Sequence, residues 1–309
     1  MLAGAAALAP AVALAHGSAA PAPSAWVLLT HWEFDPVFII ITGLSLWLYF
    51  SGVRQVNRVH VKSPWPRKRS VFFVLGVAVM VFAVASPLAS YDTTLFSLHM
   101  LQHLLLTMVA APLMLLGTPI TLALRAAAPD VRKKVLLPIL HSGFVRALTF
   151  PVFPWMLFTF VLWGSHFTPL YNDALEHAWL HRVEHVAYLA AALLFWWEVI
   201  GLDPTPWRLH HAVRALYVFL QMPLNSWLAV SIYSADHVLY SHYATLSRGW
   251  GPSPLLDQQL AGVFMWVFGD MMFLIALALV IAAWVRQDER DAKRQDRELA
   301  RQREQALRA

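Results

Sequence analysis

The chain alternates between long apolar runs and short polar segments, and this pattern predicts helices that cross a membrane. Seven runs are long enough, because a spanning helix needs about 20 predominantly apolar residues. They lie near 34–52, 70–88, 95–117, 148–166, 180–201, 211–232 and 257–285. Within lipid, only helices and closed barrels satisfy all of their backbone polar groups. Runs of this length therefore predict an all-α polytopic membrane bundle of about seven transmembrane helices.

The segments outside these runs have different compositions. Residues 1–15 form a short Ala-rich apolar run that ends in Ala13-Leu14-Ala15, which is typical of a signal peptide with a cleavage site before His16. Residues 16–33 are rich in Ala and Pro and predict a linker outside the membrane. Residues 286–309 alternate basic and acidic side chains, which predicts a charged, solvated tail after a membrane domain of residues 34–285.

Lysine and arginine gather on one side of the predicted bundle. Of 23 such residues, 21 lie in residues 53–69 and 118–147, near 208–214, and in the tail, and only Arg182 and Arg248 lie on the other side. Cytoplasmic loops carry an excess of positive charge, so this pattern predicts an N-terminus outside and a C-terminus in the cytoplasm. The formal charge of +5 does not indicate nucleic-acid binding, because the basic residues flank apolar spans.

The composition limits the chemistry that such a bundle can carry. Hydrophobic residues make up 59% of the chain and charged residues only 13%, whereas a soluble domain carries about a quarter charged residues. The sequence has no cysteine, which excludes disulfides, thiolate metal sites and iron–sulfur clusters. It has 14 histidines and 10 methionines, so a bound metal ion would be held by His, Met, Asp or Glu.

Two histidines lie inside the apolar run 95–117. His99 and His103 are four residues apart, which places them about 40° apart on one helix face with a rise of roughly 6 Å. Polar side chains within a membrane span are costly and mark functional sites. The spacing allows the two ring nitrogens to converge on one ion or on one partner helix.

A second group of histidines leads into the run 180–201. His177, His181 and His185 follow each other at four-residue intervals, and the outer two lie roughly 12 Å apart along a helix, so one ion can take only two adjacent members. Glu184 is placed to orient the imidazoles without binding the ion itself. If this helix packs against residues 95–117, two plus two imidazoles form a site near the outer surface. A donor set of histidine and methionine without thiolate suits copper, and it suits zinc less specifically.

Other interpretations of these histidines are open. A lone interfacial His is usually a hydrogen-bonded packing residue. His103 and His185 on facing helices fit bis-imidazole ligation in a b-type haem cytochrome. A membrane-embedded metal enzyme with Glu184 as acid or base is a third possibility, although the chain has no HExxH run. A proton or ion transporter would rest on Asp270 and Glu198, and the absence of an internal repeat argues against it.

Four segments carry a resemblance to a known family. They are SPLASYDTTLFSLHMLQHLLLTMVAAPLMLLGTP (Ser86–Pro119), EHVAYLAAALLFWW (Glu184–Trp197), PLNSWLAVSIYSAD (Pro223–Asp236) and DQQLAGVFMWVFGD (Asp257–Asp270). They resemble the multi-spanning CtaG family of cytochrome c oxidase assembly factors, and the HMLQH run followed by AAPLMLLGTP is the specific part. The resemblance covers most of residues 30–285.

The resemblance implies a non-enzymatic, multi-pass protein of the bacterial cytoplasmic (inner) membrane that helps to assemble a haem–copper cytochrome c oxidase. The expected cargo is copper, and the expected partners are oxidase subunits and the lipid bilayer, with no nucleic acid. The motifs carry over six positions that we expect to matter, namely His99, Gln102, His103, Glu184, His185 and Asp257. Taken with the spacing argument, the candidate metal ligands are His99, His103, His177, His181, Glu184 and His185.

Overall fold

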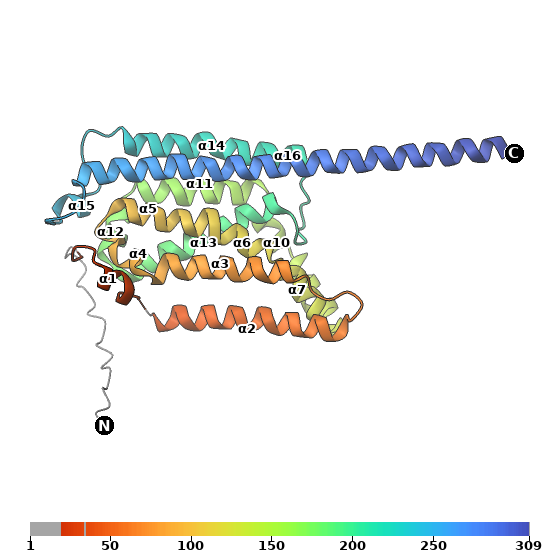
Figure 1. Cartoon of the computed structure of the whole chain (residues 1–309), viewed down its shortest axis with the longest axis horizontal. Helices are drawn as coiled ribbons and strands as arrows, with labels where there is room; N and C mark the ends of the chain where they lie inside the picture. The colour runs from red at the N-terminus through yellow and green to blue at the C-terminus, as the bar shows by residue number, and fades with distance from the viewer. Residues whose placement is uncertain (1–19, 34, 309) are drawn as a thin grey trace, which may run out of the picture.

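The computed structural model of the protein describes residues 20–33 and 35–308. Every element in this part of the chain is a helix, which confirms the predicted all-α fold class. The long helices lie roughly parallel in one bundle (Figure 1). The expected signal peptide, residues 1–15, lies outside the described residues. The described part of the expected linker includes the short helix α1 (Ala25–Thr30).

The remaining elements follow in chain order. They are α2 (Pro36–Val59), α3 (Arg67–Ala85), α4 (Pro87–Asp92), α5 (Phe96–Leu104), the π-helix η1 (Leu105–Ala110), α6 (Ala111–Leu116), α7 (Pro119–Ala126), α8 (Pro129–Val131), the π-helix η2 (Arg132–Leu136), α9 (Leu137–Leu140), α10 (Gly143–Leu148), α11 (Val152–His166), α12 (Leu170–Glu176), α13 (Ala178–Ile200), α14 (His211–Tyr233), α15 (Ser241–Thr245) and α16 (Pro254–Arg308).

Six helical segments of the described chain are long and apolar enough to cross a membrane. They are Pro36–Val59, Arg67–Ala85, Phe96–Ala126, Ala178–Ile200, His211–Tyr233 and Pro254–Leu307. The other span expected from the sequence, 148–166, corresponds to α11, which has 15 residues. This helix is shorter than the usual spanning length of about 20 residues. The polytopic bundle is therefore clear, while the count of seven spans and the orientation stay predictions.

The two ends of the bundle differ. The short helices α1, α4, α12 and α15 gather at one end, whereas α7 and α10 lie at the other, where α16 continues past the bundle (Figure 1). Helix α16 has 55 residues, which corresponds to about 80 Å at 1.5 Å per residue. The charged tail expected at residues 286–309 is thus, over its described part, a helical extension of the last span.

The run from α5 to α6 contains a π-helix for an identifiable reason. In η1 the backbone N–H of Ala111 bonds the carbonyl of Leu106, five residues back. The same pattern would pair Pro112 with the Thr107 carbonyl, but proline has no N–H to donate. The indole Nε1 of Trp196 on α13 donates to that carbonyl at 2.8 Å instead. This bond ties the α5–α6 run to α13 at a fixed register.

The end of the bundle formed by α4 and α15 is held by buried polar contacts. The Tyr243 hydroxyl donates to the Asp92 carbonyl at 2.7 Å, and Arg248 Nη1 donates to the Thr94 carbonyl at 2.8 Å. These bonds join the segment between α14 and α16 to the turn between α4 and α5. They close the bundle over the first turns of α5 and α13.

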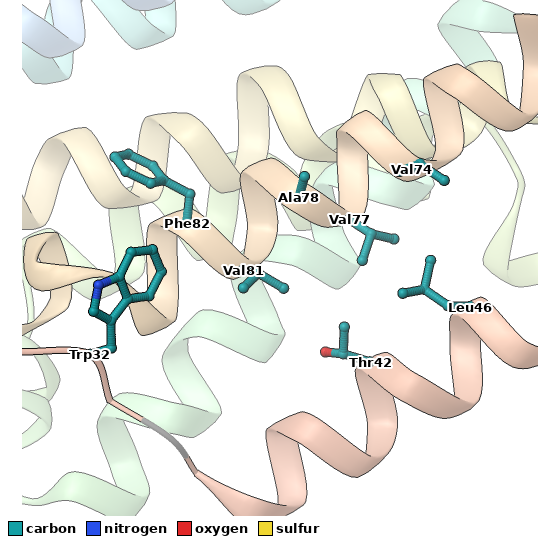
Figure 2. Close-up of a pocket in the computed structure, with 8 residues that line it drawn as sticks. All are labelled: Trp32, Thr42, Leu46, Val74, Val77, Ala78, Val81 and Phe82. Carbon is teal, nitrogen blue, oxygen red and sulfur yellow. The ribbon is translucent and has the colours of Figure 1, made fainter. Parts of the chain in front are cut away.

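An apolar cavity of about 420 Å³ separates α2 from α3, on the periphery of the bundle. Figure 2 shows its lining of Thr42 and Leu46 from α2, five side chains of α3, and Trp32. A largely apolar gap between two membrane helices suits lipid acyl chains. No histidine of the predicted site lines this cavity, so it is separate from the chemistry described next.

Candidate metal centre

Four imidazoles from two helices form one group, in which His99, His103 and His181 are buried and His185 is half-buried. Ring centroids of His99 and His103 on α5 lie 4.4 Å apart, and those of His181 and His185 on α13 lie 4.3 Å apart. Across the helix pair, His99 lies 5.1 Å from His181 and His103 lies 5.6 Å from His185. The rings thus occupy the corners of a quadrilateral, which we call the four-imidazole cluster. The structure brings together the two histidine pairs that the sequence placed on separate helices.

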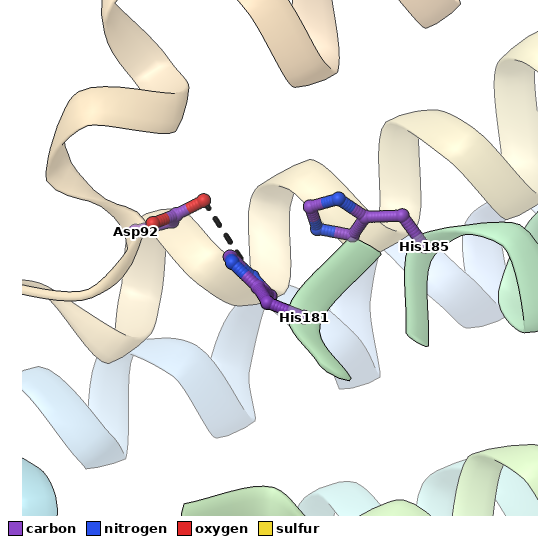
Figure 3. Close-up of side chains that lie close together, drawn as sticks. All are labelled: Asp92, His181 and His185. Carbon is purple, nitrogen blue, oxygen red and sulfur yellow. Dashed lines mark ion pairs between the residues drawn. The ribbon is translucent and has the colours of Figure 1, made fainter. Parts of the chain in front are cut away.

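Two carboxylates border the four-imidazole cluster. An oxygen of Glu184 on α13 lies 3.8 Å from His99 Nε2, and an oxygen of Asp92 at the end of α4 lies 3.7 Å from His181 Nε2. Both side chains are buried. Figure 3 shows Asp92 facing His181, with His185 on the next turn of α13. Two carboxyl groups beside the imidazoles offer oxygen donors, and a bound cation would favour their ionised form.

The distances suit a single ion after small side-chain movements. One atom each from His99, His181 and Glu184 lies within 4.8 Å of the others, and the same holds for Asp92, His181 and His185. Ligands of a tetrahedral ion with bonds of about 2.0–2.1 Å lie roughly 3.4 Å apart. His181 belongs to both sets, which makes it the centre of the candidate site.

The ring nitrogens of His99 and His103 support this interpretation. All four atoms are buried and have no hydrogen-bond partner among the described residues. An unsatisfied buried polar group costs about 1–3 kcal/mol, so buried imidazoles normally have a protein, water or metal partner. A neutral imidazole has one nitrogen with a free lone pair, so these two rings supply two donors that a metal ion would satisfy, one from each ring.

Gln102 fixes the orientation of His185. Its amide nitrogen donates to the Ala83 carbonyl at 2.9 Å, so its oxygen faces His185 Nε2 at 3.0 Å. An amide oxygen can only accept, which makes His185 Nε2 the donor and leaves Nδ1 as the nitrogen available to an ion. Hydrogen bonds of this kind orient metal-binding imidazoles.

If the cluster holds copper, Gln102→Leu should weaken its binding about 10–100-fold, the usual effect of removing such a supporting hydrogen bond. The leucine keeps the volume but frees His185 to adopt the other tautomer. Competition titration with a copper chelator measures the change. Gln221 is also fully buried but lies on α14, so Gln221→Leu is the matched control. An equal loss in both variants would contradict the assigned role of Gln102.

The other residues expected from the sequence lie elsewhere. His177 is exposed at the N-cap of α13, and its Nδ1 lies 3.0 Å from the Asp173 carbonyl. It is not among the four rings that contact one another. Asp257 lies at the start of α16, where its carboxylate accepts from the backbone N–H of Phe96 at 2.7 Å. Asp257 therefore caps α5, the helix that carries His99, rather than acting as a ligand.

Asp92 is a site residue that the sequence analysis did not single out. It lies in the short helix before α5, and the turn at residues 93–95 brings it back beside His181. Burial raises the pKa of the Asp92 carboxyl well above its usual range, and the Glu33 carboxylate adds to the effect. A cation in the cluster would act in the opposite direction by stabilising the carboxylate.

Comparison with known proteins places the chain in a family. Three mycobacterial proteins of uncharacterised function align over 278 residues, or 87% of this chain: ML1998 of Mycobacterium leprae at 31% identity, and Mb0105 of Mycobacterium bovis and MT0111 of Mycobacterium tuberculosis at 30%. The aligned region is 41–42% of these relatives, so the chain spans less than half of their length. No solved structure matches.

The sequence profile described as cytochrome c oxidase caa3 assembly factor (Caa3_CtaG) matches residues 47–287, which is well over half of the chain. The matched region contains the four-imidazole cluster and its two carboxylates. It also contains all four segments that carried the resemblance noted in the sequence. The chain belongs to the cytochrome c oxidase caa3 assembly factor family.

Proposed function

We propose that this protein binds copper at the four-imidazole cluster and delivers it to a haem–copper cytochrome c oxidase during assembly. The observation that carries the proposal is the set of four buried ring nitrogens on His99 and His103 that have no hydrogen-bond partner among the described residues. Family membership supports the oxidase as the partner, and the donor set supports the ion as the cargo.

The ligand chemistry favours copper among the common metals. Imidazoles with flanking carboxylates bind both copper and zinc, but copper binds more tightly to a given nitrogen site in the Irving–Williams order. Asp92 and Glu184 supply up to two negative charges, which balance a divalent ion. The metal centres of a haem–copper oxidase include copper, so this ion links the site to the family.

The spacing of the rings favours one ion over a haem. Neighbouring centroids lie 4.3–5.6 Å apart around the quadrilateral. Bis-imidazole ligation requires a planar macrocycle between two rings, and it would have to pass through the space that the other two rings occupy. A single ion needs only the small side-chain movements described above.

The position of the cluster suits transfer to a partner in the same membrane. His99 is the fourth residue of α5 and His181 the fourth of α13, so both lie near the end of the bundle that α4, α12 and α15 cover. The charge distribution predicts that this end faces outward. Ligand exchange between imidazoles would pass the ion to an oxidase site without a change in its oxidation state.

The test is metal loading of the purified protein in detergent. We expect about one Cu(II) per chain, with nitrogen hyperfine coupling from imidazoles in the electron paramagnetic resonance spectrum. His177→Leu should bind equally, because this side chain is exposed and lies outside the cluster. A Soret band in the purified protein would instead support the haem interpretation, and a protein that binds neither group would overturn both.

A further inference from the structure

A second soft-donor pair lies beside the four-imidazole cluster. The Nε2 of His166, at the end of α11, lies 3.3 Å from the sulfur of Met100 on α5. Both side chains are buried. We propose that this pair is a separate binding site for a soft monovalent cation, namely Cu(I), which we call the thioether–imidazole site. The proposal rests on the proposed function in taking copper as the cargo.

The hydrogen bonds of His166 fix its tautomer. Nδ1 lies 2.7 Å from the carbonyl oxygen of Leu162, one turn back on α11. A carbonyl only accepts, so a contact this short requires the proton on Nδ1. The neutral ring then has a lone pair, and no proton, on Nε2.

Two lone pairs therefore face each other without a shared proton. The Met100 thioether is an acceptor only, and it lies opposite the unprotonated Nε2 of His166. Such a pair gains nothing from hydrogen bonding, but both atoms are ligands for a soft cation. Thioether and imidazole together select Cu(I) over Zn(II) and Cu(II).

The thioether–imidazole site adjoins the cluster through shared aromatic neighbours. The Tyr171 ring lies 5.2 Å from the His99 ring and 5.5 Å from the His166 ring. The Tyr188 ring lies 4.0 Å from His103, and its hydroxyl lies 3.4 Å from His166 Nδ1. Met100 also follows His99 directly on α5. The two sites are thus neighbours, each with its own donor atoms.

This arrangement assigns the second site to Cu(I) alone. The four-imidazole cluster offers nitrogen and oxygen donors that suit Cu(II) as well, whereas the thioether–imidazole site adds the sulfur. Under reducing conditions the protein should therefore hold more copper than under oxidising conditions. The additional copper should have a sulfur ligand.

The experiment is Cu(I) loading under reducing conditions, followed by copper X-ray absorption spectroscopy of the full-length protein. Wild type should show a sulfur scatterer near 2.3 Å, the length of a metal–sulfur bond. In Met100→Leu the sulfur scatterer should vanish, and one equivalent of Cu(I) should bind about tenfold more weakly or be lost. His166→Gln should give the same result. Met265→Leu, which removes another buried sulfur from the same apolar cluster, should behave as wild type.

A variant without the cluster separates the two proposals. His99→Leu/His103→Leu should keep the sulfur-ligated Cu(I) while it loses Cu(II). If that variant binds both ions as wild type does, the proposed function fails while the thioether–imidazole site stands. The site is overturned if wild type shows no sulfur scatterer, or if Met100→Leu keeps the signal with unchanged Cu(I) binding. Thermal unfolding of each variant confirms that the protein is folded before the spectra are compared.

Discussion

Replacing both histidines of α5 in His99→Leu/His103→Leu should abolish stoichiometric Cu(II) binding, with an affinity loss of about 100-fold or more. Two of the four imidazoles disappear, and an ion left with two nitrogens and two carboxylates loses both the donors and the geometry of the site. Chelator competition and the nitrogen hyperfine pattern measure the loss. Oxidase activity in membranes from cells that carry the variant should fall with it.

The same variant should leave the metal-free protein as stable as wild type, or more stable. The four ring nitrogens of His99 and His103 have no hydrogen-bond partner among the described residues, so the apolar side chains remove a desolvation cost. A packing role would give the opposite result, with copper retained and stability lost. Thermal unfolding without metal therefore distinguishes a metal site from a structural one. His177→Leu, at the exposed N-cap of α13, should change neither property.

The helical architecture could be predicted from the sequence because a membrane forces it. Apolar runs of about 20 residues must become helices in lipid, and their approximate positions follow from hydropathy. The run at 148–166 shows where this rule fails. Pro151 disfavours a helical conformation at the residue before it, and the chain breaks between α10 and α11, so α11 begins only at Val152 and is shorter than its apolar stretch.

The candidate site could be predicted only in part. Four-residue spacing placed His99 with His103, and His181 with His185, because helical periodicity is local. The packing of α5 against α13 is not local. It depends on the π-helix after His103 and on the bond from Trp196 to the Thr107 carbonyl. Pro112 could have indicated a distortion there, but its consequence for the facing helix required the structure.

Asp92 and Asp257 show that the contacts of buried carboxylates are equally hard to predict from the sequence. Each lies next to a helix terminus, so the sequence alone suggests a cap for the adjacent helix. In the structure Asp92 instead faces His181, and Asp257 caps a helix 160 residues away in the chain. Contacts of this range leave no periodic signal, because they arise from the way that the helices associate.

The capping role of Asp257 leads to a large expected effect on stability. Leu95, the N-cap residue of α5, has no side chain that can accept a hydrogen bond. The Asp257 carboxylate accepts from the backbone N–H of Phe96 at 2.7 Å and from the Ser97 hydroxyl at 2.5 Å. It also lies 3.8 Å from Arg248 Nη2, and both charged side chains are buried. A negative charge at this position further complements the helix dipole.

We therefore expect Asp257→Ala to lower the free energy of unfolding by about 3–5 kcal/mol, because Arg248 would become an uncompensated buried charge while α5 loses its cap. Unfolding in mixed detergent with increasing SDS measures the change. Asp130 pairs with Lys134 on an exposed surface, so Asp130→Ala is the control and should show no measurable effect. Copper affinity should also fall in Asp257→Ala, because fraying of the first turn of α5 displaces His99. Wild-type stability in Asp257→Ala would show that Arg248 finds another partner and that α5 does not depend on this cap.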